Sequence, residues 1–194
     1  MYKAVLDTCV LVPGMQRDFL LQLAAESAYA PHWSSGVLNE LIDVLNRIDV
    51  KKNRSTNGER RAVLLRRMSA AFPGAEIQAP RDREYGYGLR DPDDEHVLHA
   101  ALMSGADAIV TDDQRAGLLD SDIVREASIE ILTGDEFITN TAYAHRDKAV
   151  MAVLTLYRRR RNPPMESPAA ILAHLCRSAE MKELYALLID DLTE

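Results

Sequence analysis

The chain has 194 residues, of which 47% are hydrophobic and 27% are charged, enough to bury the core of one ordinary domain with a small extension. No run approaches the roughly 20 apolar residues of a membrane-spanning helix, and the opening MYKAVLDTCV lacks the basic region and cleavage site of a secretory signal, so a cytoplasmic location is expected. The net charge of −7 argues against a protein that coats nucleic acid by simple electrostatic attraction.

The first part of the chain is expected to alternate short strands with amphipathic helices, as α/β proteins do. The expected strands cover residues 3–6, 29–32 and 75–78, and the expected helices cover residues 19–28, 37–45 and 59–72. Asp7 directly follows the first strand, and a serine, Ser34 or Ser35, precedes the second helix as its cap. The polar or glycine-containing segments 51–58 and 80–90 are expected to be loops.

The stretch over residues 91–113, DPDDEHVLHAALMSGADAIVTDD, joins a helix to a buried strand. Pro92 suits a first helical turn and the acids beside it suit the positive end of a helix dipole, so a helix is expected over residues 93–104, ended by Gly105. The apolar run 106–110 predicts a strand buried on both faces, as in a parallel sheet. Acids at the helix start and after the strand are therefore expected at the carboxyl edge of the sheet, where ligands bind.

The chain changes character near residue 140. A loop with a short turn is expected over residues 114–122, then a strand over 128–132 and a helix that starts near Gly134. Beyond this point only helices are expected, over residues 144–160, 168–177 and 179–192. The sequence therefore predicts an α/β domain at residues 1–140 and an all-helical C-terminal extension at residues 141–194.

Acidic residues are expected to converge at the sheet edge. They are Asp7 after the first strand, Glu40 on the second helix, Asp94 at the start of the central helix and Asp113 after the strand that follows it. Mg²⁺ or Mn²⁺ prefers such oxygen ligands, and phosphodiester hydrolysis is the natural reaction of such an ion beside a substrate phosphate. Thr111 could orient a carboxylate or a water molecule. Glu40, judged by its helix position alone, could equally be a solvated residue.

Other polar residues have simpler explanations. Asp91, Asp93, Glu95 and Asp112 fit helix-start and turn preferences, with Asp91 and Asp112 kept as secondary candidates. His96 and His99 lack the partners of a zinc site, and Ser34 and Ser35 have no histidine nearby in sequence for a catalytic triad. Cys9 and Cys176 are expected to be buried structural cysteines rather than a disulfide. The sequence contains no Walker loop and no GxGxxG motif.

Two segments are candidates for RNA contact. Arg60, Arg61, Arg66 and Arg67 are expected on the surface of one helix, as a patch for the phosphate backbone or simply as a solvated face. Tyr85 and Tyr87, in a glycine-containing loop, could stack on bases or pack under the loop. The arginines at 158–161 suit the negative end of a helix dipole.

Four segments together resemble a known family. VLDTCVLVPGMQRDFL, HWSSGVLNEL, RDPDDEHVLHAALMSGADAIVTDD and ILTGDEFI are similar, in order and spacing, to a PIN-domain ribonuclease of the VapC toxin type, over residues 1–140. The resemblance implies a PIN-like three-layer α/β fold with a central, mostly parallel sheet flanked by helices. It also implies that Asp7, Glu40, Asp94 and Asp113 are the metal-binding and catalytic acids.

The match has two departures and an extension. Cys9 stands where many members of the family have Asn, and Asp113 stands where Asn is frequent. Because Asp112 directly precedes Asp113, either of the two could be the fourth ligand. The helices after residue 140 are similar to the extension of longer VapC-like toxins.

The function implied by this resemblance is an Mg²⁺-dependent endoribonuclease that acts as the toxin of a type II toxin–antitoxin system. The implied partners are RNA, with tRNA or rRNA favoured, a cognate protein antitoxin and a second copy of the chain in a homodimer. Two alternatives remain. The first is a metal-dependent phosphatase for small molecules, but the chain lacks the nucleophilic Asp-x-Asp motif because Thr8 and Cys9 follow Asp7. The second is a non-catalytic module that binds a partner through its helical tail.

Overall fold

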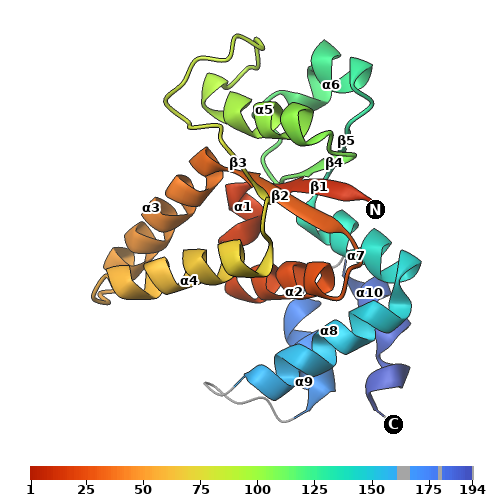
Figure 1. Cartoon of the computed structure of the whole chain (residues 1–194). Coiled ribbons are helices and arrows are strands. Elements are labelled where there is room, and N and C mark those ends of the chain that lie inside the picture. Colours follow the sequence, from red (N-terminus) through yellow and green to blue (C-terminus); the bar gives the residue numbers. More distant parts are fainter. Residues whose placement is uncertain (161–166, 179–180, 194) are drawn as a thin grey trace. The chain divides into compact units, whose positions relative to one another are not determined.

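The structure is a computed structural model that describes residues 1–160, 167–178 and 181–193 (Figure 1). The chain divides into two compact units. The sheet unit contains Tyr2–Val12 and Ala30–Leu132, and the helical unit contains Met1, Pro13–Tyr29 and Thr133–Glu194. The predicted domain boundary at residue 140 stays a prediction.

The sheet unit is built on five strands that all run parallel, in the order β3-β2-β1-β4-β5. The strands are β1 (Lys3–Leu6), β2 (Ala30–Ser34), β3 (Glu76–Ile77), β4 (Ala108–Val110) and β5 (Glu130–Leu132). Val5 pairs with His32 on one side and with Ile109 on the other, so β1 lies in the middle (Figure 1). The residues of β4 are all apolar and buried, as the sequence predicted for a strand covered on both faces.

Helices of this unit connect the strands and pack on them. They are α1 (Thr8–Leu11), α3 (Ser35–Lys51), α4 (Gly58–Ala71), η1 (Pro92–Asp94), α5 (Glu95–Ser104), η2 (Leu118–Asp120) and α6 (Asp122–Glu126). α5 packs against β1, β2 and β4, and α3 packs against β2. Ser34 is the cap of α3 and accepts from the backbone N of Val37 at 2.8 Å, and Gly105 ends α5 in the left-handed conformation, with φ of 59°. Both cap assignments are confirmed.

The start of the central helix and one later helix differ from the prediction. The residues before α5 form a 3-10 turn, capped by Asp91, whose side chain accepts from the backbone N of Asp93 at 3.1 Å. Residues 122–126, where no element was expected, form α6, because Ser121 accepts from the backbone N of Val124 and caps a helix too short to show an apolar period.

The helical unit contains no strand within its described residues. Its helices are α2 (Gly14–Ala25), α7 (Gly134–Ala144), α8 (Arg146–Arg159), α9 (Pro168–Leu175), α10 (Lys182–Leu188) and η3 (Asp190–Leu192). α8 packs against α2, α7 and α9, and the rings of Tyr29 and Phe137 meet edge to face at 4.8 Å. Arg161 and the start of the third predicted tail helix, residues 179–180, lie outside the described residues.

The predicted fold class, α/β with a mostly parallel central sheet flanked by helices and with C-terminal helices, is confirmed, and the sheet is wholly parallel. None of the helices in the described parts of the chain combines the length and apolarity that crossing a membrane requires.

Candidate active site

The carboxyl edge of the sheet holds the candidate site, next to the central strand. The chain leaves β1 for β2 on one side, and after β3 it crosses to β4 on the other side of β1. This reversal is the place where open parallel sheets bind ligands, since the connections diverge there and leave space between them. Asp7 follows β1 and Thr111 follows β4, so both residues lie at the reversal.

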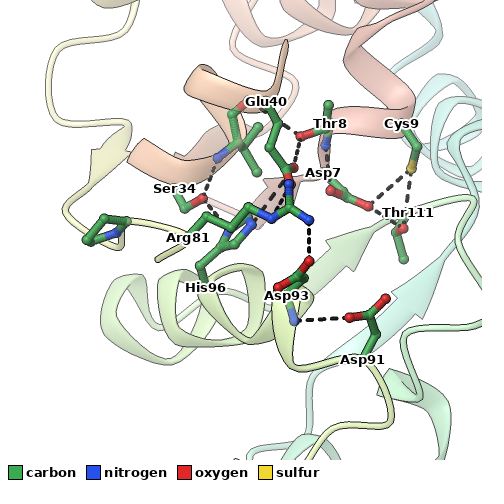
Figure 2. A network of polar contacts seen from close by, with 12 residues as sticks. Asp7, Thr8, Cys9, Ser34, Glu40, Arg81, Asp91, Asp93, His96 and Thr111 are labelled. Carbon is green, nitrogen blue, oxygen red and sulfur yellow. Dashed lines mark hydrogen bonds and ion pairs between the residues drawn. The ribbon is translucent and has the colours of Figure 1, made fainter. Parts of the chain in front are cut away.

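Asp7 is fixed by three donors (Figure 2). Its Oδ1 accepts from the backbone N of Thr8 at 2.5 Å, and its Oδ2 accepts from Thr111 Oγ1 at 2.6 Å and from Cys9 Sγ at 3.2 Å. Burial raises the pKa of Asp7, and the charge of Glu40 raises it further, although the three hydrogen bonds act in the opposite direction. The side chain is therefore buried and oriented, and burial disfavours its charged form.

Glu40 reaches the same region from α3. Its Oε2 accepts from Thr8 Oγ1 at 2.7 Å, and its Oε1 lies 3.0 Å from Arg81 Nε (Figure 2). His96 Nε2 lies 3.8 Å from Oε2, which is too long for a hydrogen bond. Burial acts to raise the pKa of Glu40, but His96, Thr8 and Arg81 together bring it below its ordinary value. Glu40 is thus held in the charged form.

Asp94 carries the clearest electrostatic signature of the site. Burial first, and then the charges of Asp7, Asp91, Asp113 and Glu40, raise its pKa to about 7. Carboxylates influence one another this strongly only when they lie close together in a partly desolvated place. The carboxylate of Asp94 therefore lies near those of Asp7, Asp91, Asp113 and Glu40. We call the four predicted acids the acidic cluster: Asp7, Glu40, Asp94 and Asp113.

The residues after β4 extend this cluster. The backbone N of Asp113 donates to Thr111 Oγ1 at 3.1 Å, and its carboxylate accepts from the backbone N of Arg115 at 2.8 Å. Asp112 is exposed, and its backbone N donates to Cys9 Sγ at 3.1 Å. The charge of Asp113 is among those that raise the pKa of Asp94. Which of Asp112 and Asp113 would be the fourth ligand stays open.

The acidic cluster suits a divalent metal ion in the chemistry of its donors. All are carboxylate oxygens, and burial first, then the charges of neighbouring acids, raise the pKa values of Asp7 and Asp94, a cost that a hard cation would relieve. As the side chains stand, no three His, Cys, Asp or Glu residues of the described chain are arranged to hold an ion. Thr8, Thr111 and Arg81 instead engage the oxygens of Asp7 and Glu40. The assignment of these acids as metal ligands stays a prediction.

Thr8 and Arg81 were not predicted to join this network, and the contact between Ser34, predicted only as a possible helix cap, and His96 was not predicted either. Ser34 Oγ lies 2.7 Å from His96 Nδ1, although 62 residues separate them in the chain. Ser34 is wholly buried and also caps α3, so the pair supports the helix and does not supply a nucleophile. No signal in one sequence joins these residues, because the contact depends on α5 packing against β2.

The cysteine prediction is wrong in one respect. Cys9 and Cys176 are both free, but each is only half-buried. Burial and the charge of Asp7 raise the pKa of Cys9 to about 12, so its thiol stays protonated and acts as a donor to Asp7.

The predicted RNA-contact residues divide into two groups. Arg60, Arg66 and Arg67 are exposed on α4. The prediction that Arg61 lies on the surface is wrong: it is only 9% exposed, its guanidinium pairs with Asp49, and it donates to the carbonyl of Leu45 at 3.2 Å. An arginine held in this way is committed to packing α4 against α3.

The two loop tyrosines pack within the sheet unit, as one of the two interpretations expected. The ring of Tyr85 lies 4.6 Å from that of His99, and the hydroxyl of Tyr87 lies 2.7 Å from His99 Nδ1.

Comparisons with known proteins agree with this architecture. A family model described as the PIN domain matches residues 3–115, more than half of the chain. Searches of curated proteins and of solved structures returned no match to the chain. The matched segment begins with β1, includes α3 and α5, and ends just after Asp113, so it contains the whole acidic cluster. The chain therefore belongs to the PIN-domain family, whose members are in general metal-dependent nucleases.

Proposed function

We propose that the protein is an endoribonuclease that hydrolyses RNA phosphodiester bonds with Mg²⁺, or Mn²⁺ in its place, held by Asp7, Glu40, Asp94 and Asp113. The observation that carries this proposal is the contact network at the carboxyl edge of the sheet: Thr8 contacts the carboxylates of both Asp7 and Glu40, and the charges of these two acids act on the half-buried Asp94. A protein gains nothing in stability from such repulsion, so an arrangement of this kind is typical of a functional site. Membership of the PIN-domain family supports a nucleic acid as the substrate.

Each side chain has a definite task in this proposal. A bound divalent ion supplies positive charge and Lewis acidity beside the scissile phosphate. Thr111 and Thr8 hold the carboxylates of Asp7 and Glu40 in single orientations, which lowers the entropy lost when those oxygens bind a cation. Asp94 would add a further carboxylate, and a bound cation would favour its charged form against the burial and neighbouring acids that raise its pKa.

We further propose that the nuclease acts as the toxin of a type II toxin–antitoxin system in the cytoplasm. The resemblance of the four sequence segments to VapC-type toxins supports this role, as does the family match over residues 3–115. The partners would be a cognate protein antitoxin, a second copy of the chain, and tRNA or rRNA as the substrate.

Cleavage of total RNA by the purified protein tests the nuclease activity. We expect Mg²⁺-dependent fragments from the parent protein and none from Glu40→Gln or Asp7→Ala. Asp43→Asn is the matched control, because Asp43 is exposed on the same helix as Glu40 and should leave cleavage unchanged. Equal cleavage by the parent and Asp7→Ala, or full cleavage after chelation of divalent ions, would refute the proposed chemistry.

Induced expression in growing cells tests the toxin role separately. We expect growth arrest with one defined pattern of tRNA or rRNA fragments, and relief of both by Asp7→Asn. Normal growth alongside robust cleavage in vitro would refute the toxin role and leave the nuclease proposal standing.

A further inference from the structure

Arg81 places a guanidinium inside the acidic site. It lies on the segment after β3, with Nε 3.0 Å from Glu40 Oε1 and with Nη2 paired to Asp93 (Figure 2). The charge of Asp94 also acts on it. The side chain is 47% exposed, so solvent and a substrate can both reach it.

The contact of Arg81 with Glu40 is where a metal ion would compete. Thr8 Oγ1 donates to Glu40 Oε2, and Arg81 Nε forms an ion pair with Oε1, so both oxygens already have partners. The Arg81 contact is the more exposed of the two, and Thr8 is buried. A cation that uses Glu40 therefore displaces the guanidinium more readily than the hydroxyl.

Glu40 keeps support when Arg81 leaves. His96 Nε2 is buried, has no hydrogen-bond partner within the described residues, and lies 3.8 Å from Glu40 Oε2. Ser34 fixes the far side of the same ring at 2.7 Å. A small movement of the carboxylate toward His96 would complete a hydrogen bond, so release of Arg81 does not leave Glu40 without a partner.

We propose, building on the nuclease function above, that Arg81 balances the charge of the acidic cluster through Glu40 when no metal ion is bound, yields this position to the metal ion, and then binds the phosphate of the substrate. A guanidinium has five N–H donors in a planar fork that matches a phosphate, and the Glu40 and Asp93 contacts use only Nε and Nη2. The segment that carries it is held in place, because the hydroxyl of Tyr85 donates to the carbonyl of Pro80 at 2.8 Å.

Among the described residues, His96 and Arg115 also contact the acidic cluster, but His96 is buried and Arg115 is held only weakly. The other arginine there is Arg115, whose Nε is 3.7 Å from Asp113 and whose side chain is 93% exposed. Such a contact is weak and readily screened by salt. Arg81 is therefore the residue placed to exchange a carboxylate for a phosphate.

Binding of Mn²⁺ to the RNA-free protein tests the exchange, measured by calorimetry on the full chain. We expect Arg81→Ala to bind Mn²⁺ about 3-fold more tightly than the parent, since a half-exposed ion pair no longer competes. Arg83→Ala is the matched control: it removes the same charge two residues along the same loop, and Arg83 lies over the ring of Tyr85 at 5.4 Å instead of on the acids. Its Mn²⁺ affinity should equal that of the parent.

Cleavage of RNA at saturating Mn²⁺ tests the phosphate role in the same proteins. We expect kcat/KM of Arg81→Ala to fall by about 10-fold or more, with a raised KM, and Arg81→Lys to fall less because it keeps the charge without the fork. Tighter metal binding with weaker cleavage is the expected pattern, which a merely structural residue would not produce.

Two results would overturn the inference: Arg81→Ala binding Mn²⁺ no more tightly than Arg83→Ala, or cleaving RNA with the kcat/KM of the parent. If the parent protein cuts no RNA, the proposed function fails and the phosphate role fails with it. The Mn²⁺ comparison would still decide whether Arg81 competes for the cation.

Discussion

Thr111 Oγ1 donates to Asp7 Oδ2 at 2.6 Å and so joins the ends of β4 and β1, which are 104 residues apart in the chain. The same hydroxyl accepts from the backbone N of Asp113 at 3.1 Å. One buried side chain therefore sets the positions of two members of the acidic cluster, and the geometry of the proposed site depends on it.

Replacement of Thr111 by Val should separate the role of its hydroxyl in orienting the acids from the role of its side chain in packing. The substitution keeps the shape of the side chain but removes the hydroxyl, so we expect RNA cleavage to fall by about 10- to 100-fold, as for other residues that orient metal ligands. The free energy of unfolding should fall by about 1–2 kcal/mol, because two buried polar groups lose their partner. Cleavage rates and urea denaturation measure these effects. Thr111→Ser is the control, and equal activity of the Ser and Val variants would contradict the prediction.

Asp94 should make the protein less stable as the pH rises. Its pKa is raised to about 7 in the folded chain, from the ordinary value of 3.8, so the folded state binds the proton more tightly than the unfolded state does. Its contribution to stability is therefore present below about pH 4 and is lost as the pH rises through about 7.

Asp94→Asn removes this charge and should reveal its effect. We expect the variant to match the parent near pH 4 and to exceed its free energy of unfolding by about 1 kcal/mol near pH 8, a value reduced for screening at this half-exposed group. Denaturation in urea across this pH range measures the difference. A constant difference at all pH values would be inconsistent with the raised pKa.

Addition of Mg²⁺ should distinguish Asp113 from Asp112. An ion present at about 100 times its Kd stabilises a folded protein by about 2.7 kcal/mol, which for this size raises Tm by roughly 5–10 °C. We expect Asp113→Asn to reduce this rise because the charge of Asp113 acts on Asp94, whereas Asp112→Asn should preserve it because that side chain is exposed. Thermal unfolding with and without Mg²⁺ gives the answer, and the reverse ranking would assign the fourth position to Asp112.

The strands and the acids that follow them were predictable because their signals are local. The apolar runs ending at Leu6 and Val110 predicted β1 and β4, and parallel pairing alone then brings Asp7 near Thr111. Glu40 was ambiguous by its own position, since a helix residue between apolar neighbours can face either way. Only the family resemblance favoured it, and the contact with Thr8 now shows where it lies.

Arg81 and Arg61 show two different limits of the sequence. Arg81 could not be predicted, because its contacts depend on the path of an irregular loop. Arg61 could have been: it is seven residues from Met68, the other buried residue of α4, and this spacing puts both on one face of the helix. Its charge suggested the surface, whereas Asp49 and Leu45 satisfy that charge in the interior.

Gly36 offers a test of the support behind Glu40. A Cβ added at Gly36 would lie 3.0 Å from Cγ and Nδ1 of His96 and 3.1 Å from the carbonyl of Ala79. Gly36→Ala must therefore displace the His96 ring and disturb its contact with Ser34. We expect a loss of about 1–2 kcal/mol in the free energy of unfolding, together with slower RNA cleavage, because crowding in a packed site forces neighbours to shift.

Gly58→Ala is the matched substitution, since nothing lies within 4 Å of a Cβ added there. Gly58 opens α4, so alanine should stabilise the protein slightly, by up to about 1 kcal/mol, and leave cleavage unchanged. Urea denaturation and initial cleavage rates of the two variants measure these effects. The same glycine-to-alanine change should lower the free energy of unfolding at Gly36 and raise it at Gly58. If both alanines were equally tolerated, His96 would have room to move, and its proposed support of Glu40 would have to be abandoned.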